Sequence, residues 1–332
     1  MGKILVIQTA FLGDLILSTV LFKRIKKVHP NSHLTLIVNK GTESILKNNP
    51  NLDKIITVDK KKTYKNPIEF IKFLISLNNE NFEICYSPHF SHRSSIISFF
   101  SGASIRVGYK QSGFSFLHTK LIDRPVRGMH EVHKLLSLLG DKGVERPEIF
   151  PEISEMPKIK EKLDSFRNYI VVAPSSIWET KRMPIDKFIQ LTQKILDETN
   201  YLPVIVGSST DIQLCNALVN KFGEKIINFT GKTNLMELSY IISRAEAVIS
   251  NDSSPIHIAS AFNIPTLAIF GATIPDFGYT PLSDRNVISE VNLECRPCGI
   301  HGGHTCPKIH FKCMMDQDIQ EIFAKLLVLL NN

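Results

Sequence analysis

Hydroxyl and basic side chains follow an apolar run in the second half of the chain. The run YIVVA, at 169–173, leads into PSSIWETKRMP, which contains Ser175, Ser176 and Lys181. A lysine beside hydroxyls at the end of a buried strand can hold a phosphate group, because all three donate hydrogen bonds and the ammonium adds charge. Lys181 also lies just before a helix that Pro184 is expected to open. A cation near a helix N-terminus is unfavourable unless an anion lies beside it, so this position favours phosphate binding over a solvated surface charge.

A second polar turn comes after the apolar run EAVIS, at 246–250. It consists of Asp252, Ser253 and Ser254, and a helical pattern follows it. The first N–H groups of a helix have no partner within the helix and bind diphosphates readily. His257 lies one turn inside this helix, where a histidine is more often structural than part of a site. The turn therefore predicts a diphosphate site, with His257 as a further candidate.

Gly271 directly follows a third apolar run, PTLAIF, at 265–270. A glycine at the end of a strand lets the backbone approach a ligand closely. A simple turn would explain the same residue equally well. Gly271 is therefore a candidate for binding the same ligand.

An acidic residue stands where a nucleotide-binding fold would place a phosphate loop. The run KILVIQ, at 3–8, is followed by Gly13 and Asp14 at the start of a helical pattern. A carboxylate there would repel phosphate. It can cap the helix, whose N-terminus favours negative charge. It can also take a proton from a reacting hydroxyl.

Four of the six cysteines are concentrated in residues 295–313. Cys295, Cys298, Cys306 and Cys313 have the spacing C-x2-C-x7-C-x6-C. The first pair has the spacing of zinc ligands, but the second pair does not repeat it. A structural zinc site is one interpretation. Reduced cysteines in a compact loop, or a local disulfide, are the favoured alternative.

These motifs lie between apolar runs that alternate with helical patterns in both halves. Runs of Val, Ile and Leu without polar alternation indicate strands buried on both faces, and their alternation with helices indicates βαβ units. The stretch at 145–162 is rich in proline and charge, and is typical of a linker. We therefore predict an α/β fold with two Rossmann-like, doubly wound parallel-sheet domains at 1–150 and 151–332, with ligands bound in a cleft beyond the carboxyl ends of the strands. The strands are expected at 3–8, 33–38, 54–58, 82–87 and 104–108, and at 169–173, 202–206, 225–229, 246–250 and 265–270. Helices are expected between them, near 14–28, 41–48, 66–78 and 91–101 in the first half and near 184–198, 209–222, 233–243 and 254–262 in the second.

Composition limits the classes of function. The 332 residues suffice for two domains, and 43% hydrophobic with 21% charged residues is typical of globular proteins. No apolar run approaches the roughly 18 residues that cross a bilayer, and the N-terminus lacks the features of a signal peptide, so we expect a cytoplasmic protein. The net charge of +7 favours an anionic partner. Nucleic acid is not expected, because no basic stripe interleaved with aromatics occurs.

Four segments together resemble glycosyltransferase family 9, the ADP-heptose:lipopolysaccharide heptosyltransferases. They are GDLILSTVL, APSSIWETKRMP, NDSSPIHIASAFNIPTLAIFGATIPD and CRPCG…CP…HFKCM, in that order. The stretch HRSSIISFFSGASIRVGY and the cysteine-rich tail are most similar to the heptosyltransferase II branch. The resemblance implies a GT-B fold, an ADP-heptose donor in the C-terminal domain and a lipopolysaccharide inner-core acceptor in the N-terminal domain. It also implies transfer with inversion and without a required metal cofactor.

The resemblance also implies roles for single residues. Lys181 resembles the family's phosphate-binding lysine, which would stabilise the leaving group, and Asp14 resembles the proposed catalytic base. Asp252 and the Ser253–Ser254 turn resemble the donor loop, although many relatives have glycine where Ser254 stands. A side chain there narrows the approach of the backbone to the diphosphate.

The acceptor in this family is anionic, so basic residues of the N-terminal half are candidates for binding it. We expect Arg93 and Arg106, with Gly13, to take part. A basic face could also hold the enzyme at the inner-membrane surface, where the acceptor is anchored.

Three rival functions follow from the same residues. One is transfer from the same donor to a protein or another glycan. Another is a catalytically silent module that binds nucleotide-sugars. A dinucleotide-dependent oxidoreductase is disfavoured, because no G-x-G-x-x-G follows any expected strand.

Overall fold

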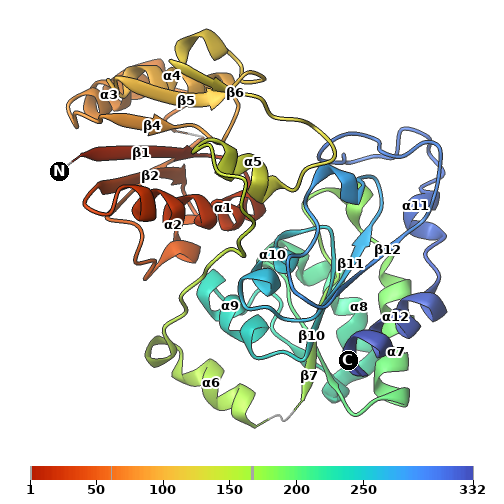
Figure 1. Ribbon diagram of the computed structural model, residues 1–332. Coiled ribbons are helices and arrows are strands. Elements are labelled where there is room, and N and C mark those ends of the chain that lie inside the picture. Colours follow the sequence, from red (N-terminus) through yellow and green to blue (C-terminus); the bar gives the residue numbers. More distant parts are fainter. Residues whose placement is uncertain (1, 61, 166–167, 332) are drawn as a thin grey trace. The chain divides into compact units, whose positions relative to one another are not determined.

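The computed structural model describes residues 2–60, 62–165 and 168–331 (Figure 1). The chain forms two compact units, Met1–Phe150 and Pro151–Asn332. Each unit contains a six-stranded parallel sheet with helices on its faces. This confirms the predicted α/β class with two doubly wound, Rossmann-like sheets.

The sheet of the first unit has the strand order β3-β2-β1-β4-β5-β6, and every neighbouring pair is parallel. The central strands come from the continuous apolar runs, which are buried because helices cover both faces. Five strands lie close to the expected positions, and β6 at the edge was not expected. The bounds are β1 Lys3–Gln8, β2 His33–Asn39, β3 Lys54–Val58, β4 Ile84–Tyr86, β5 Ile105–Tyr109 and β6 Lys120–Ile122.

Helices α3 (Pro67–Asn78) and α4 (His92–Phe100) cover one face of this sheet. Leu74 and Leu77 of α3 pack there in one core cluster with Leu5 and Ile7 of β1. The other face carries three helices, α1 (Leu12–Leu17), α2 (Thr19–Val28) and α5 (Glu131–Ser137).

The single helix expected near 14–28 is two helices, α1 and α2, which meet at Ser18. The hydroxyl of Ser18 donates to the carbonyl oxygen of Asp14 at 2.7 Å, and that of Thr19 donates to Ile16 at 2.7 Å. Such side-chain bonds to the preceding turn compete with a regular helix. The helix expected at 41–48 is a single 3₁₀ turn, Glu43–Leu46.

The sheet of the second unit has the order β12-β11-β10-β7-β8-β9 and is also parallel throughout. The edge strand β12 was not expected from the sequence. The bounds are β7 Tyr169–Ala173, β8 Leu202–Ile205, β9 Ile227–Asn228, β10 Ala247–Asn251, β11 Thr266–Phe270 and β12 Asn286–Glu290.

The main core of this unit joins β7, β8, β10 and β11 to four helices through residues such as Ile170, Phe188, Cys215 and Phe323. The small α6 lies partly in the stretch expected to be a linker. The helices are α6 Pro157–Asp164, α7 Ile185–Glu198, α8 Ile212–Phe222, α9 Leu235–Ser243, α10 Ser254–Ala261, α11 Lys312–Met315 and α12 Ile319–Asn331.

Each sheet has one reversal point, which is the pair of neighbouring strands where the chain stops adding strands on one side of the sheet and starts adding them on the other. It lies between β1 and β4 in the first unit and between β7 and β10 in the second. Loops leaving the carboxyl ends of such a strand pair diverge to opposite faces of the sheet, which opens a crevice for ligands. The residues after these four strands are therefore the places to look for a site.

Candidate functional site

A buried ion pair lies at the reversal point of the second sheet. Lys181 comes from the loop after β7, and its Nζ is 2.6 Å from Oδ2 of Asp252, which directly follows β10. The hydroxyl of Thr273, from the loop after β11, donates to the same oxygen at 2.7 Å. The side chains of Lys181 and Asp252 are only 12% and 6% exposed. An ammonium has three donors, so Lys181 can hold Asp252 and an anionic ligand at once.

An asparagine at the end of β10 holds the loop that carries Lys181. The amide nitrogen of Asn251 donates to the carbonyl oxygen of Pro174 at 2.8 Å, and its oxygen accepts from the backbone N–H of Met183 at 3.0 Å. Asn251 is completely buried. Both ends of the 174–183 loop are therefore fastened to β10, which fixes Lys181 beside Asp252.

The N-terminus of α10 lies at the same point. Ser253 is its N-cap and Ser254 its first residue. The hydroxyl of Ser253 donates to the carbonyl oxygen of Ser175 at 3.3 Å, which joins this turn to the loop after β7. The structure thus brings Ser175, Lys181 and Asp252 to the start of a helix, where N–H groups favour an anion.

Three other predicted residues are held by packing or by protein partners. His257 is 3% exposed, and its ring lies 6.3 Å from that of Tyr279 between centroids. The hydroxyl of Ser175 donates to Asp211. The backbone oxygen of Ser176, which is also buried, accepts from Nε of Arg182 at 2.5 Å.

Gly271 has a packing reason to be glycine. A Cβ at this position would lie 2.5 Å from Cε of Met314. Met314 belongs to α11 and is completely buried in the main core. Close packing of Met314 against the end of β11 therefore requires glycine, whether or not a ligand approaches.

The cysteine-rich segment 295–313 braces two loops of the site. Arg296 donates to the carbonyl oxygens of Gly271 and Thr273, the latter at 2.8 Å. The backbone N–H of Gly303 donates to the hydroxyl of Thr180 at 2.8 Å, next to Lys181. The sequence argument missed Arg296 and Thr273. Thr273 follows β11 closely, and that position was the available signal.

All six cysteines are free thiols. Cys295 Sγ lies 3.8 Å from Nε2 of His310. Within residues 2–60, 62–165 and 168–331, no three histidine, cysteine or acidic side chains are grouped to hold a metal ion. Burial, followed by the neighbouring Cys298, raises the pKa of Cys313 to about 11. Elemental analysis of protein purified without a histidine tag tests the zinc interpretation.

Asp14 lies in the first turn of α1, at the reversal point of the first sheet. Its Oδ2 accepts from the backbone N–H of Phe11 at 3.3 Å, so it caps the helix. Asp14 and the preceding Gly13 are both half-buried. The carboxylate is therefore partly exposed to solvent at the start of α1.

A hydroxyl and imidazole cluster joins β1 and β4 at the same reversal point. Nδ1 of His89 lies 2.8 Å from the hydroxyl of Thr9 and 3.1 Å from that of Ser94. Arg93, exposed in the first turn of α4, lies over the ring of Tyr64 at 5.1 Å. Burial raises the pKa of Tyr64 to about 12, which keeps its phenol protonated. The sequence argument had selected only Arg93 of these residues.

Arg106 lies elsewhere than expected for an acceptor-binding residue. It is the second residue of β5, so it lies at the amino ends of the strands, whereas Asp14 follows the carboxyl end of β1. Its guanidinium donates to the carbonyl oxygens of Leu117 at 2.9 Å and Ala103 at 2.7 Å. These bonds give Arg106 a structural role.

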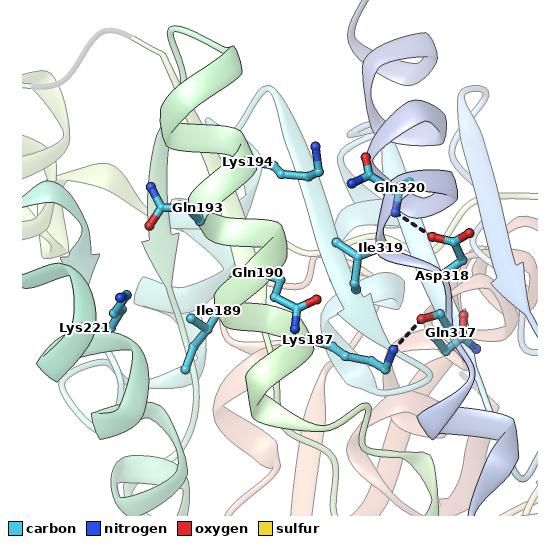
Figure 2. A pocket seen from close by; sticks show the side chains of 10 residues that line it. All are labelled: Lys187, Ile189, Gln190, Gln193, Lys194, Lys221, Gln317, Asp318, Ile319 and Gln320. Carbon is cyan, nitrogen blue, oxygen red and sulfur yellow. Dashed lines mark hydrogen bonds between the residues drawn. The ribbon is translucent and has the colours of Figure 1, made fainter.

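A separate groove of about 630 Å³ opens between α7, α8 and the start of α12 (Figure 2). Lysine and glutamine side chains dominate its lining, and Nζ of Lys187 donates to the carbonyl oxygen of Gln317 at 2.7 Å. None of the candidate residues from the sequence lines this groove.

Comparison with known proteins agrees with this architecture. The chain is 25% identical over 303 residues to lipopolysaccharide heptosyltransferase 2 of Escherichia coli strain K12, covering 85% of this chain and 86% of that protein. It is equally identical, over 291 residues, to lipopolysaccharide heptosyltransferase 1 of Campylobacter coli, covering 82% and 84%. The solved structure of E. coli ADP-heptose lps heptosyltransferase II superimposes with a TM-score of 0.80 at 22% identity, covering 99% and 98%, which shows a shared GT-B-type fold.

A family model covers the part of the chain that carries most of these features. The model for glycosyltransferase family 9 (heptosyltransferase) matches residues 70–305, which include Lys181, Asp252 and Thr273. With two doubly wound sheets and a buried cation beside a helix N-terminus, the chain belongs to glycosyltransferase family 9.

Proposed function

We propose that the protein transfers heptose from ADP-heptose to the inner core of lipopolysaccharide, with inversion at the anomeric carbon, in the manner of heptosyltransferase II. The observation that carries the proposal is the buried Lys181–Asp252 pair at the reversal point of the second sheet. Relatives named heptosyltransferase 1 and 2 are both 25% identical to the chain. Identity therefore does not distinguish which position of the acceptor receives the heptose, and that position is part of the proposal.

In this proposal the second unit binds the donor. The diphosphate lies against Lys181 and the N–H groups at the start of α10. As the bond from the anomeric carbon to ADP breaks, negative charge grows on the leaving phosphate, and Lys181 stabilises it. Loss of one such donor typically costs about 3–4 kcal/mol of barrier. Asp252 serves as the fixed partner that keeps the ammonium in place.

The first unit supplies the base. A hydroxyl of the acceptor attacks the anomeric carbon, and its proton passes to the carboxylate of Asp14. One carboxylate suffices, because inversion in a single displacement forms no glycosyl-enzyme intermediate, and we expect an oxocarbenium-like transition state by analogy with glycosidases. Arg93 is the candidate for binding the anionic groups of the acceptor. With a lipid-anchored acceptor, the reaction would take place at the cytoplasmic face of the inner membrane.

Mass spectrometry of defined core acceptors incubated with nucleotide-sugars tests the proposal. We expect a mass increase of one heptose on the core acceptor with ADP-heptose alone. Transfer from another nucleotide-sugar would contradict ADP-heptose as the donor. Transfer only to a protein or another glycan would contradict the lipopolysaccharide core as the acceptor. Binding of ADP-heptose without release of ADP would identify a silent binding module.

A further inference from the structure

Helix α3 of the first unit is apolar on two opposite faces. Its inner face packs on the sheet through Leu74 and Leu77. On the outer face, Ile68, Ile71 and Ile75 are 64%, 55% and 58% exposed. Spacings of three and four residues place these isoleucines in one stripe along the helix. A surface helix normally carries polar residues there, so the stripe calls for a partner.

The exposed apolar area continues at the end of the neighbouring helix. Helices α3 and α4 lie side by side on one face of the sheet (Figure 1). Phe99 and Phe100 at the end of α4 are exposed and stack edge to face at 5.3 Å. The carboxyl ends of the two helices meet, because a Cβ at Gly102 would lie 2.8 Å from Oδ1 of Asn78.

Several lysines lie close in sequence to this apolar area. Lys60, Lys62 and Lys65 precede α3, and Lys72 lies within it. The acidic residues of this stretch are fewer, and Glu69 is held by Lys72 at 3.1 Å. Apolar side chains flanked by lysines match the boundary between acyl chains and anionic headgroups.

We propose that this α3 surface docks the protein onto an anionic lipid bilayer. The α3 surface comprises Ile68, Ile71, Ile75, Phe99 and Phe100 with the lysines at 60, 62, 65 and 72. The 12 residues of α3 span about 18 Å, too short for a bilayer core of about 30 Å, so the helix would lie in the plane of the membrane. Within the described residues, no helix is long and apolar enough to cross a bilayer.

A bilayer fits this surface better than a second copy of the chain does. A symmetric dimer buries the same patch of both copies, so it collects the lysines of two chains in one interface. Like charges in an interface are unfavourable, whereas anionic headgroups attract them.

The surface also lies beside the candidate acceptor site. The loop from β3 to α3 contains Tyr64, whose ring lies under Arg93. Docking through α3 would therefore bring the loop from β3 to α3, and Arg93 beside it, close to the membrane. The purpose of the docking, access to a lipid-anchored acceptor, rests on the proposed function, but the docking itself does not.

Co-sedimentation with vesicles tests the proposal without donor or acceptor. We expect the full chain to bind vesicles of phosphatidylglycerol and phosphatidylethanolamine, more weakly at high salt, and to bind phosphatidylcholine vesicles far less. The variant I68S/I71S/I75S should lose about tenfold or more in partitioning, because its apolar anchor is removed. The variant K62Q/K65Q should lose about fivefold per lysine with anionic vesicles only.

The matched control is I153S/I212S/V328S, which changes three exposed apolar residues of the second unit. It should bind vesicles like the wild type, and all variants should keep the wild-type thermal unfolding midpoint. Unchanged vesicle binding by I68S/I71S/I75S would overturn the proposal. A dimer in solution that this variant dissociates, with no vesicle binding by the wild type, would overturn it in favour of self-association.

The two proposals fail in different experiments. Heptose transfer to a soluble, deacylated acceptor should be the same for wild type and I68S/I71S/I75S. Vesicle binding without any transfer would contradict the proposed function only. Transfer without vesicle binding would contradict the docking surface only.

Discussion

Lys181 and Asp252 are separated by 71 positions in the sequence and form a 2.6 Å ion pair between the loops after β7 and β10. These are the two strands that flank the reversal point of the second sheet. Thr273 completes the cluster from the loop after β11. The cation is therefore in place before any ligand arrives, because three loops of the sheet fix it.

Replacing Lys181 by methionine should damage both stability and activity. The change leaves the buried carboxylate of Asp252 without its counter-charge, which typically costs about 3–5 kcal/mol of unfolding free energy. The double variant K181M/D252N removes both charges and should recover most of that stability without recovering turnover. Urea unfolding and ADP release measure the two effects. Recovery of turnover in the double variant would contradict a role of Lys181 in the reaction.

Replacing Asp14 by asparagine separates capping from proton transfer. Asparagine can still accept the hydrogen bond from Phe11 but cannot take a proton, so turnover should fall by about 10²–10⁴ with little change in stability. Glu237 is a matched control, because it accepts from the backbone N–H of Asn234 at 2.8 Å at the same position of α9. The variant E237Q should keep full activity. Wild-type turnover by D14N would show that Asp14 only caps the helix.

Replacing Gly271 by alanine should destabilise the second unit by about 1–3 kcal/mol, because the added methyl group overlaps Met314. A smaller partner, as in G271A/M314V, should restore part of the loss. The control is G303A, where the nearest atom to an added Cβ is 3.8 Å away. Denaturant unfolding and ADP titration distinguish the two roles. Weaker ADP binding at unchanged stability would mean that Gly271 matters through the ligand instead.

His118 should make the first unit less stable in mild acid. Burial, followed by the nearby charge of Arg106, lowers the pKa of His118 from 6.5 to about 4. Between these values the unfolded chain binds a proton that the folded chain does not. Stability should therefore fall as the pH drops through this range, by up to about 3 kcal/mol.

The variant H118Q removes this titration and should flatten the dependence between about pH 7 and about pH 5. Urea unfolding at the two pH values measures it. The control for the substitution itself is H304Q, at a histidine whose side chain is 69% exposed. An unchanged slope in H118Q would show that His118 does not titrate in this range.

The order of elements was largely predictable because the buried strands are continuous apolar runs. The edge strands β6 and β12 were missed, since β6 has only three residues and both are partly exposed, so neither forms a continuous buried apolar run. The break at Ser18 was also missed, because it depends on the hydroxyls of Ser18 and Thr19 bonding to the preceding turn.

The site was predictable as a set of positions but not as a set of contacts. Lys181, Asp252 and the serine turn were candidates because each follows a strand. Their pairing could not be derived, because the strand order that makes β7 and β10 neighbours is a long-range property. The same holds for Arg106, whose guanidinium is engaged by two carbonyls at the amino end of β5.

The sequence by itself determined the class of fold, the approximate strand positions and the residue types that follow each strand. Those features depend on local patterns of apolar and polar residues, which can be recognised along the chain. The tertiary structure alone decided which of these residues meet, why Gly271 must be glycine, and that the stripe of isoleucines on α3 faces solvent. Each of these depends on contacts between segments distant in sequence, and local patterns do not contain them.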